Sequence, residues 1–417
     1  MNVLWVVNVP TPEACNLFGL PYTPYGGWLV ESSNLLSKSI DSLSIVFPVS
    51  KTNLIDNKQG DSINYYIFPN KESSSSYTME VVLVNCKPDI VHIYGTEMPH
   101  TLAMIKACKQ LDIPFVLSIQ GLVSVYSEHV YGNLPIHVRY LFTLRNILKR
   151  DNAFGIKRLM KKRGLEEIES IKNSANIVGR TLWDYSCIAE INPGARYYHC
   201  NETLRKSFYS DLKWSRDCCE AFSIFVSQGH YPIKGIHNVI GAVNILKKQF
   251  PDVKLYISGK NTQFDNAFKQ CFLTTYYDRY IGKLIKKYDL SKNVIFLGQL
   301  NDEEMHKKLL SSHVYVCSST IENSPNSLGE AMIAGVPSIT SFVGGIPSLA
   351  ENETEVLFYQ HDAPYMLAAQ IQRVFKSDEL ASALSISGIQ RAEVTHSPVA
   401  NNETILNVYN KCIMCGS

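Results

Sequence analysis

The sequence contains no apolar run of the roughly 18 residues that a membrane-spanning helix needs. Residues 1–9 are typical of a buried strand, not of a basic segment followed by an apolar signal sequence. The 11 cysteines are odd in number and scattered through apolar segments, which favours reduced core thiols over a disulfide framework. These absences predict a cytoplasmic protein.

The sequence also lacks a large excess of either charge, because 40 lysines and arginines against 38 acidic residues leave a formal net charge of +2. A near-neutral chain is not drawn as a whole to nucleic acid, and no motif with base-stacking aromatic residues appears. The hydrophobic fraction of 45% is ordinary for a globular enzyme. A chain of 417 residues is long enough for about two domains with separate cores.

Apolar, β-branched segments alternate with helical patterns. In the first half the strand-like segments are 3–9, 43–48, 63–69, 90–94, 115–119 and 175–178, and the helical patterns between them include 28–37, 78–86 and 101–111. This alternation predicts an α/β fold with a doubly wound, mainly parallel sheet. Ligands of such sheets bind at the carboxyl ends of the strands.

The second half repeats this architecture. Polar residues interrupt the apolar periodicity between Asn201 and Glu220, so the domain boundary is expected there. We predict an N-terminal domain over 1–205, a C-terminal domain over 206–395 and a terminal helix over 396–417.

The most informative segment is 318–350, in which a strand-like run, 313–317, leads into a polar loop, a helix, a Gly-Val-Pro turn and a short strand. The pattern predicts a helix that begins at Pro325, with Ser324 as its cap. The first N–H groups and the dipole of such a helix suit a phosphate. Glu322 and Glu330 flank this point, and carboxylates suit the hydroxyls of a sugar attached to that phosphate. The structural alternative for Glu330 is a capping box with Ser327.

Glu322 and Glu330 form a Glu-x7-Glu pattern, which continues into AMIAGVP at 331–337 and GGIP at 344–347. This combination closely resembles the signature of retaining, GT-B-type glycosyltransferases of family 4. The resemblance implies two Rossmann-like domains that face each other across a cleft, with a C-terminal helix that crosses back to the first domain. It also implies transfer of a sugar from a UDP- or GDP-linked donor to an acceptor hydroxyl, with retention, in polysaccharide or lipopolysaccharide assembly.

The resemblance carries roles for the donor. Glu322 would contact the sugar near the reacting carbon, and Glu330 would bind the ribose hydroxyls. Lys234 corresponds to the lysine that reaches the donor diphosphate, in the loop after the strand 222–227. His230 stands where the family has an arginine, directly after Gly229.

Three residues at the start of the motif helix complete the implied donor site. The backbone N–H groups of Asn326, Ser327 and Leu328 would stabilise the charge that grows on the leaving phosphate. No Asp-x-Asp metal site is evident in the sequence. We therefore expect a metal-independent enzyme without a cofactor, in which the nucleotide sugar is a co-substrate.

The first domain is expected to bind the acceptor, a carbohydrate or a lipid-linked glycan. Gly26 and Gly27 end the first β–α loop, and in the family such a pair faces the donor phosphates and the acceptor. A tight entry into a helix explains them equally well. Gln120 replaces a family histidine and cannot titrate. Arg180 suits an acceptor phosphate or a structural ion pair.

A basic stretch follows in the first half. It interleaves apolar side chains with Arg139, Arg145, Lys149, Arg150, Lys157, Arg158, Lys161, Lys162 and Arg163. Such a segment suits peripheral contact with the inner face of an anionic membrane, or with a lipid-diphosphate acceptor. An exposed helical face is the alternative.

Other functions remain open on the same scaffold. One is a nucleotide-sugar epimerase or a phosphorylase, although no lysine stands out as a pyridoxal phosphate site. Another is a non-catalytic protein that binds a nucleotide sugar, which Gln120 and His230 favour and which Glu322, Glu330 and Lys234 disfavour.

Overall fold

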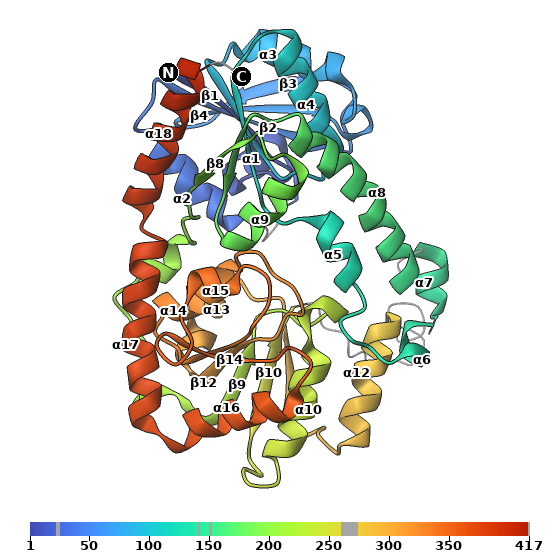
Figure 1. Cartoon of the computed structure of the whole chain (residues 1–417), viewed down its shortest axis with the longest axis vertical. Helices are drawn as coiled ribbons and strands as arrows, with labels where there is room; N and C mark the ends of the chain where they lie inside the picture. Colours follow the sequence, from blue (N-terminus) through green and yellow to red (C-terminus); the bar gives the residue numbers. More distant parts are fainter. Residues whose placement is uncertain (22–25, 141, 150–151, 260–273, 416–417) are drawn as a thin grey trace. The chain divides into compact units, whose positions relative to one another are not determined.

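The computed structural model describes residues 1–21, 26–140, 142–149, 152–259 and 274–415 (Figure 1). The chain divides into two compact units. Unit 1 consists of Met1–Val125, Lys161–Arg205 and His396–Ser417, and unit 2 of Tyr126–Met160 and Lys206–Thr395. Most of the predicted first domain therefore lies in unit 1, but residues 126–160 pack with unit 2.

Unit 1 is built on a parallel sheet. Among the described residues it has eight strands in the order β3-β4-β2-β1-β5-β6-β7-β8. The strands are β1 (Asn2–Val6), β2 (Ser42–Val49), β3 (Asp56–Gln59), β4 (Ile63–Pro69), β5 (Ile90–Tyr94), β6 (Phe115–Ser118), β7 (Asn176–Gly179) and β8 (Arg196–His199). All of them pair in parallel except the edge strand β3, which runs antiparallel to β4. From β1 the chain builds outward to one side and then returns to β5 on the other, so the topological switch point lies between β1 and β5.

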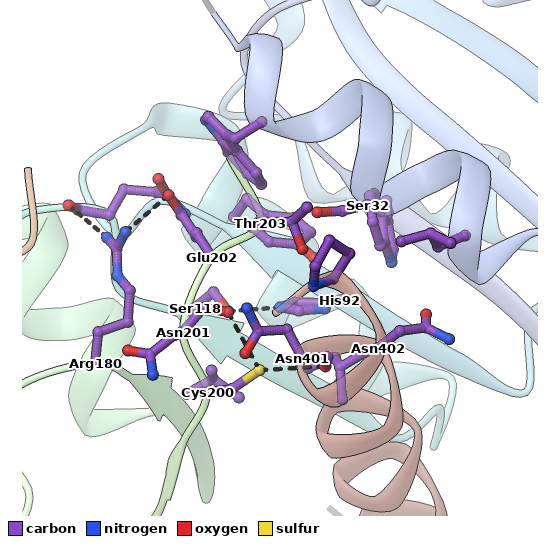
Figure 2. Close-up of a pocket in the computed structure, with 18 of the residues that line it drawn as sticks. Ser32, His92, Ser118, Arg180, Cys200, Asn201, Glu202, Thr203, Asn401 and Asn402 are labelled. Carbon is purple, nitrogen blue, oxygen red and sulfur yellow. Dashed lines mark hydrogen bonds and ion pairs between the residues drawn. The ribbon is translucent and has the colours of Figure 1, made fainter. Parts of the chain in front are cut away.

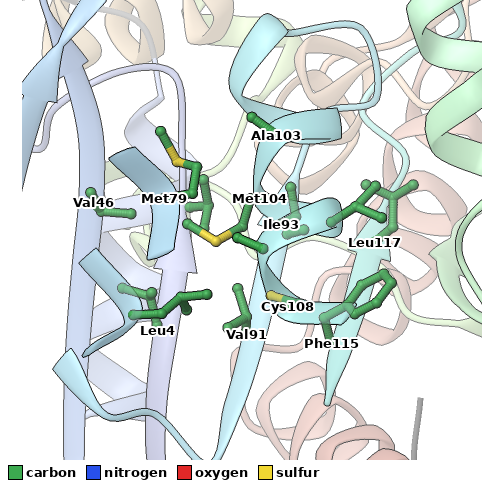
Figure 3. Packing of buried hydrophobic residues seen from close by; sticks show 14 of the residues in the cluster. Leu4, Val46, Met79, Val91, Ile93, Ala103, Met104, Cys108, Phe115 and Leu117 are labelled. Carbon is green, nitrogen blue, oxygen red and sulfur yellow. The ribbon is translucent and has the colours of Figure 1, made fainter. Parts of the chain in front are cut away.

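Helices cover both faces of this sheet, because successive strand residues point to opposite sides. On one face Leu4 of β1 packs in a cluster with Met79 of α3 (Ser76–Cys86) and Met104 of α4 (Pro99–Gln110) (Figure 3). The predicted doubly wound sheet is therefore confirmed.

The opposite face is covered partly by the end of the chain. Trp5 of β1 packs in a second cluster with α2 (Gly27–Leu36) and with Tyr409 of α18 (Pro398–Cys415). The Trp5 indole N–H donates to the Tyr409 hydroxyl at 2.9 Å. The expected return of the C-terminal helix to the first domain is confirmed.

Unit 2 contains a second, fully parallel sheet. Its six strands among the described residues follow the order β11-β10-β9-β12-β13-β14. They are β9 (Glu220–Val226), β10 (Lys254–Ser258), β11 (Val294–Gly298), β12 (Ser312–Cys317), β13 (Ser338–Ser341) and β14 (Val356–Tyr359). The switch point here lies between β9 and β12.

The helices of unit 2 pack in pairs, α10 against α16 and α14 against α17. Their bounds are α10 (Ile236–Leu246), α14 (Asn326–Ile333), α16 (Pro364–Lys376) and α17 (Asp378–Thr395). Among the described residues the remaining α-helices are α1 (Pro12–Phe18), α5 (Val123–His129), α6 (Ile136–Arg139), α7 (Leu144–Lys149), α8 (Ala153–Lys172), α9 (Leu182–Ile191), α12 (Tyr276–Lys287), α13 (Asp302–Leu310) and α15 (Ile346–Leu349). In the described part of the chain no helix is long and apolar enough to cross a membrane.

The segment Tyr126–Met160 is fixed to unit 2 by polar contacts. The Asn146 side chain accepts a hydrogen bond from the Tyr276 N–H at 2.9 Å, and the amide of Asn133 lies 2.9 Å from Nε2 of His361. These contacts join residues more than 100 positions apart, which explains why local sequence patterns do not reveal them.

Two elements were missed from the sequence. The first β–α loop contains helix α1, because Pro12 is a favourable first residue and the Thr11 hydroxyl caps the Ala14 N–H at 3.3 Å. The edge strand β3 was missed because all four of its side chains are exposed, which leaves no apolar alternation to read.

Candidate functional site

A pocket of about 240 Å³ lies at the switch point of unit 2, beyond the carboxyl ends of β9 and β12. Its lining consists of Val226, Ser227, Gln228, Lys234, Tyr315, Val316, Cys317, Ser318, Ser319, Glu322 and Ser327. Open parallel sheets bind ligands at this position. Three of the predicted donor residues, Lys234, Glu322 and Ser327, therefore share one pocket.

Lys234 and Glu322 form an ion pair in this pocket. The Lys234 Nζ lies 2.5 Å from Glu322 Oε1, and the side chains are 21% and 12% exposed. Burial opposes the lysine charge, but the neighbouring carboxylate outweighs it and raises the pKa of Lys234 above its usual value. The pocket thus presents a charged lysine and a carboxylate side by side.

The loops that carry this pair are locked to each other. The Ser318 hydroxyl donates to the Lys234 carbonyl at 2.7 Å, and the Thr320 N–H donates to the Ile233 carbonyl at 2.7 Å. Gly235 follows Lys234 with φ +68°, and a Cβ there would overlap the Ser318 carbonyl oxygen. Only glycine fits, so the backbone on either side of Lys234 is fixed by the loop after β12.

A second glycine turn holds Glu322. The Gly345 N–H donates to the Glu322 carbonyl at 2.9 Å. Gly344 has φ +51°, and a Cβ there would overlap the same carbonyl oxygen. The Gly-Gly pair of the sequence signature therefore positions the backbone of the carboxylate.

Helix α14 begins one residue later than the sequence suggests. Pro325 is the N-cap, with φ −72° and ψ 110°, and no side chain caps the helix. Ser324 as cap and Ser327 as part of a capping box were therefore wrong, since Ser327 already lies inside the helix. The Leu328 N–H donates to the Pro325 carbonyl at 2.9 Å, which leaves the N–H groups of Asn326 and Ser327 ahead of the first helical hydrogen bond.

Glu330 lies on the second turn of α14 and is only 6% exposed. It does not line the pocket, although its negative charge acts on the nearby Tyr315. Leu328 is fully buried, so it contributes packing to the helix start.

His230 and Gly229 lie beside the pocket in the loop after β9, but neither lines it. The His230 ring packs edge-on against Tyr231, with centroids 4.4 Å apart. A Cβ on Gly229 would lie 2.6 Å from Cγ2 of Ile257, so glycine is needed where the loop crosses β10.

Several pocket residues were missed from the sequence. The Ser319 hydroxyl donates to Glu322 Oε1 at 2.8 Å, and the Tyr315 hydroxyl lies 2.9 Å from the Ser227 hydroxyl. Burial raises the pKa of Tyr315 well above its usual value and that of the Cys317 thiol to about 11, so both stay neutral. The sequence could have indicated these residues, because they lie at or just beyond the carboxyl ends of β9 and β12, where ligands of parallel sheets bind.

A larger pocket lies in unit 1, again at the carboxyl ends of the strands (Figure 2), and about 560 Å³ of space lies within it when open solvent is included. Gln120 and Arg180 line it. Arg180 is 4% exposed and forms an ion pair with Glu202 at 2.8 Å, while the Gln120 amide donates to the other Glu202 oxygen at 2.8 Å. Arg180 also donates to the carbonyls of Ile119 and Gln120, both at 3.0 Å.

Gly26 and Gly27 stand at the start of α2, where close packing accounts for both. Gly26 has φ +81°, and its Cβ would lie 2.6 Å from Val9 Cγ2. A Cβ on Gly27 would lie 2.7 Å from Cδ of Arg205. Within the described residues no group of three or more histidine, cysteine or acidic side chains is arranged to hold a metal ion.

The comparisons with known proteins agree with this geometry. Residues 219–391 match the family described as Glycosyl transferases group 1. Spore coat protein SA of Bacillus subtilis is 26% identical over 370 residues, which cover 88% of this chain and 89% of that protein. The putative glycosyltransferase YtcC of the same organism is 27% identical over 189 residues. The matched part covers 43% of this chain and only 44% of the length of YtcC.

Solved structures extend the likeness to the whole fold. Sucrose-phosphate synthase from Thermosynechococcus elongatus has a TM-score of 0.71 at 16% identity, with 99% of both chains covered. HepE of Anabaena in complex with UDP-glucose has a TM-score of 0.69 at 14% identity and covers 98% of this chain and 99% of HepE. Residues 219–391 are therefore similar to the glycosyl transferases of group 1, and the chain as a whole has the GT-B fold of two Rossmann-like units.

Proposed function

We propose that the protein is a metal-independent, retaining glycosyltransferase of family 4. It transfers a sugar from a UDP- or GDP-linked donor to a hydroxyl of a carbohydrate or lipid-linked glycan, in polysaccharide or lipopolysaccharide assembly. The observation that carries the proposal is the Lys234–Glu322 pair beside the first turn of α14, at the switch point of the unit that matches the family. The UDP-glucose bound by HepE supports the donor class.

Each group of the pair suits one part of such a donor. The charge of Lys234 binds the diphosphate, and the Glu322 carboxylate accepts hydrogen bonds from sugar hydroxyls. The N–H groups of Asn326 and Ser327 and the dipole of α14 stabilise the leaving phosphate. Glu330 binds the ribose hydroxyls, which requires its buried carboxylate to become accessible when the donor enters.

The remaining donor residues have supporting roles in the proposal. His230 adds a second donor of hydrogen bonds to the diphosphate, next to Gly229. Gly26 and Gly27 keep the start of α2 open for the donor phosphates and the acceptor, in addition to the packing that they provide.

The reaction breaks the bond between the anomeric carbon and the phosphate oxygen and forms a bond from that carbon to the acceptor oxygen. The acceptor hydroxyl loses its proton in this step. Gln120 cannot take that proton, because an amide does not titrate. The base is therefore the departing phosphate, and Gln120 and Arg180 shape the acceptor side.

The basic stretch supports peripheral contact with an anionic membrane. On α8 the exposed side chains include the cations Arg158, Lys161 and Lys162, with the apolar Phe154 at 41% and Leu165 at 70% exposed. Spacings of three and four residues place these side chains on one face of the helix. Arg150 lies outside the described residues. A cationic face with apolar side chains suits anionic headgroups.

The test is calorimetric titration of the full chain with UDP, GDP and ADP. Selective binding of one nucleotide names the donor base. Glu330→Ala removes a charged hydrogen bond and should weaken binding by roughly 1.5–3 kcal/mol, or about ten- to a hundredfold. Glu353→Ala is the matched control, since Glu353 is exposed in unit 2 and pairs with Arg373.

Binding followed by sugar transfer to a glycan acceptor supports the enzyme. If nucleotide binds but no donor sugar is transferred, the protein is instead the non-catalytic nucleotide-sugar-binding protein or the epimerase. The absence of binding by all three nucleotides would contradict the proposal.

A further inference from the structure

The turn 131–134, between α5 and α6 (Figure 1), packs on the loop that carries Lys234. The turn is closed by the Gly132 N–H, which donates to the His129 carbonyl at 2.9 Å. Leu134 is fully buried and anchors the turn by its apolar side chain. The turn belongs to unit 2, although it precedes β7 in the chain.

Gly132 is the point of closest approach between the turn and this loop. It has φ +52°, and a Cβ there would overlap the Pro232 carbonyl oxygen. Only glycine lets the two backbones meet at this place. Pro232 is itself buried and begins the short 3₁₀ helix Pro232–Lys234, of which Lys234 is the last residue.

The carbonyl group that Gly132 covers also holds the Lys234 loop together. The Gly235 N–H donates to the Pro232 carbonyl at 2.9 Å, which closes the loop around Lys234. On the other side, Gly235 packs against the Ser318 carbonyl. The loop is therefore held by Gly132 at its start and by Ser318 at its end, so a shift at either contact must move Lys234.

A second contact of the turn leads to the same loop. The Asn133 amide lies 2.9 Å from Nε2 of His361, which follows β14. The Asn238 side chain donates to the His361 carbonyl at 2.9 Å, and the Asn238 N–H donates to the Gly235 carbonyl at 2.9 Å. The turn is thus connected to both ends of the Lys234 loop.

We infer that the turn 131–134 is a positioning element for the donor diphosphate, and that Gly132 acts through Lys234. Gly132 does not contact the donor. It fixes the backbone from which the Lys234 ammonium group reaches the phosphates. The inference rests on the proposed function, because it concerns the group that Lys234 binds. It gives a role in donor binding to a segment outside the matched residues 219–391.

The test compares a nucleoside diphosphate with its own nucleoside on the full chain. The probes are UDP with uridine and GDP with guanosine, and the ratio of the two affinities reports the contribution of the phosphates. Gly132→Ala should weaken diphosphate binding by about tenfold, because a displaced lysine loses a charge-assisted hydrogen bond, and should leave nucleoside binding unchanged. A purely structural role would weaken both probes alike.

Gly19→Ala is the matched control. Gly19 has φ +63°, and its new methyl group would meet no atom within 4 Å. This variant therefore carries the backbone strain of Gly132→Ala without the overlap, and it should leave both affinities unchanged.

Asn133→Gly serves if Gly132→Ala fails to fold. Asn133 has φ +61°, which glycine adopts without strain, so the variant removes only the amide beside His361. It should weaken diphosphate binding by about threefold and leave nucleoside binding unchanged.

Hydrogen exchange tests the positioning without any nucleotide. The Gly235 N–H should exchange faster in Gly132→Ala than in the unmodified chain or in Gly19→Ala, because its hydrogen bond to the Pro232 carbonyl is distorted. Unchanged exchange would overturn the inference.

The two proposals fail in different ways. If the unmodified chain binds a diphosphate and Gly132→Ala leaves the ratio of diphosphate to nucleoside affinity intact, the inference is overturned and the proposed function stands. If the unmodified chain binds no nucleotide, both are overturned, because Lys234 then has no phosphate to bind.

Discussion

The ammonium group of Lys234 and the carboxylate of Glu322 meet at 2.5 Å, and the Ser319 hydroxyl donates to the same oxygen at 2.8 Å. The two charges come from different loops, one after β9 and one after β12, so the pair links the halves of the sheet of unit 2. A donor diphosphate that binds Lys234 must therefore compete with the Glu322 carboxylate for the positive charge of the lysine.

Lys234→Met should therefore affect both stability and binding. It leaves Glu322, which is 12% exposed, without its partner and should cost about 3 kcal/mol in the free energy of unfolding. It should also weaken nucleotide binding by about ten- to a hundredfold. Urea unfolding and calorimetry measure the two effects.

The double variant Lys234→Met with Glu322→Gln separates them. It should recover most of the stability but not the nucleotide affinity. Lys247→Met is the control, because Lys247 pairs with an exposed carboxylate of Asp289 away from the pocket. Equal nucleotide affinity in Lys234→Met and Lys247→Met would contradict the role of Lys234.

Gly235→Ala tests the lock between the two loops. The added Cβ would overlap the Ser318 carbonyl and strain a residue at φ +68°, so the loop with Lys234 must shift. We expect weaker nucleotide binding together with a loss of roughly 1–3 kcal/mol in stability. Gly282→Ala is the matched control, since Gly282 lies inside α12 with no atom within 4 Å of the new methyl group. It should raise stability by about 0.5–1 kcal/mol and leave binding unchanged.

Metal removal should leave the protein active. The proposed donor site uses Lys234 and the start of α14 where other enzymes use a cation, so EDTA should change neither nucleotide affinity nor transfer. Calorimetry with and without EDTA measures this. Loss of binding that Mg²⁺ or Mn²⁺ restores would refute metal independence.

Vesicles test the basic face of α8. The full chain should co-sediment with anionic phosphatidylglycerol vesicles but not with neutral phosphatidylcholine vesicles. Reversal of Lys161 and Lys162 to glutamate should weaken this binding by about 2 kcal/mol or more. The matched control reverses Lys286 and Lys287, which are exposed on α12. Similar losses in both variants would point to overall charge and not to this face.

Acid should destabilise unit 1 through its buried histidines. Burial lowers the pKa of His92 to about 3 and that of His100 to about 4, while unfolded histidines take up protons near pH 6.5. The unfolded chain therefore binds more protons, and stability falls as pH decreases from about 6.5 to those folded values, by about 1.4 kcal/mol per pH unit for each residue. Urea unfolding between pH 7 and pH 5 measures the slope.

His92→Gln separates one histidine from the rest. Glutamine keeps a neutral donor and acceptor for Tyr409 and Ser118, which lie 2.6 Å from the two imidazole nitrogens. In this variant the number of protons taken up on unfolding in this pH range should fall by about one, so stability should depend less steeply on pH. An unchanged slope would mean that His92 already carries a proton in the folded chain.

The sequence was informative wherever apolar residues report burial directly. The strands Ile63–Pro69 and Ile90–Tyr94 match their predicted bounds, because they are buried and flanked by polar turns. Lys234 and Glu322 could also be placed together, since both follow strand ends of one parallel sheet.

The remainder depends on contacts between distant residues. Nothing near Arg180 in the sequence reveals Glu202 as its partner, and nothing in residues 126–160 reveals that they pack with unit 2. Helix α14 starts at Asn326 because Pro325 adopts the backbone angles of an N-cap. Proline is not among the residues that favour the N-cap position, so the sequence pointed to Ser324 instead.

Helix α18 completes unit 1, yet it follows every residue of unit 2 along the chain. When residue 395 has left the ribosome, every residue of unit 2 has been made, while the sheet of unit 1 still lacks Tyr409 over Trp5 and His92. Unit 1 is therefore completed only after every residue of unit 2 has been made. Until then the apolar side chains that α18 covers, including Trp5, lack that cover.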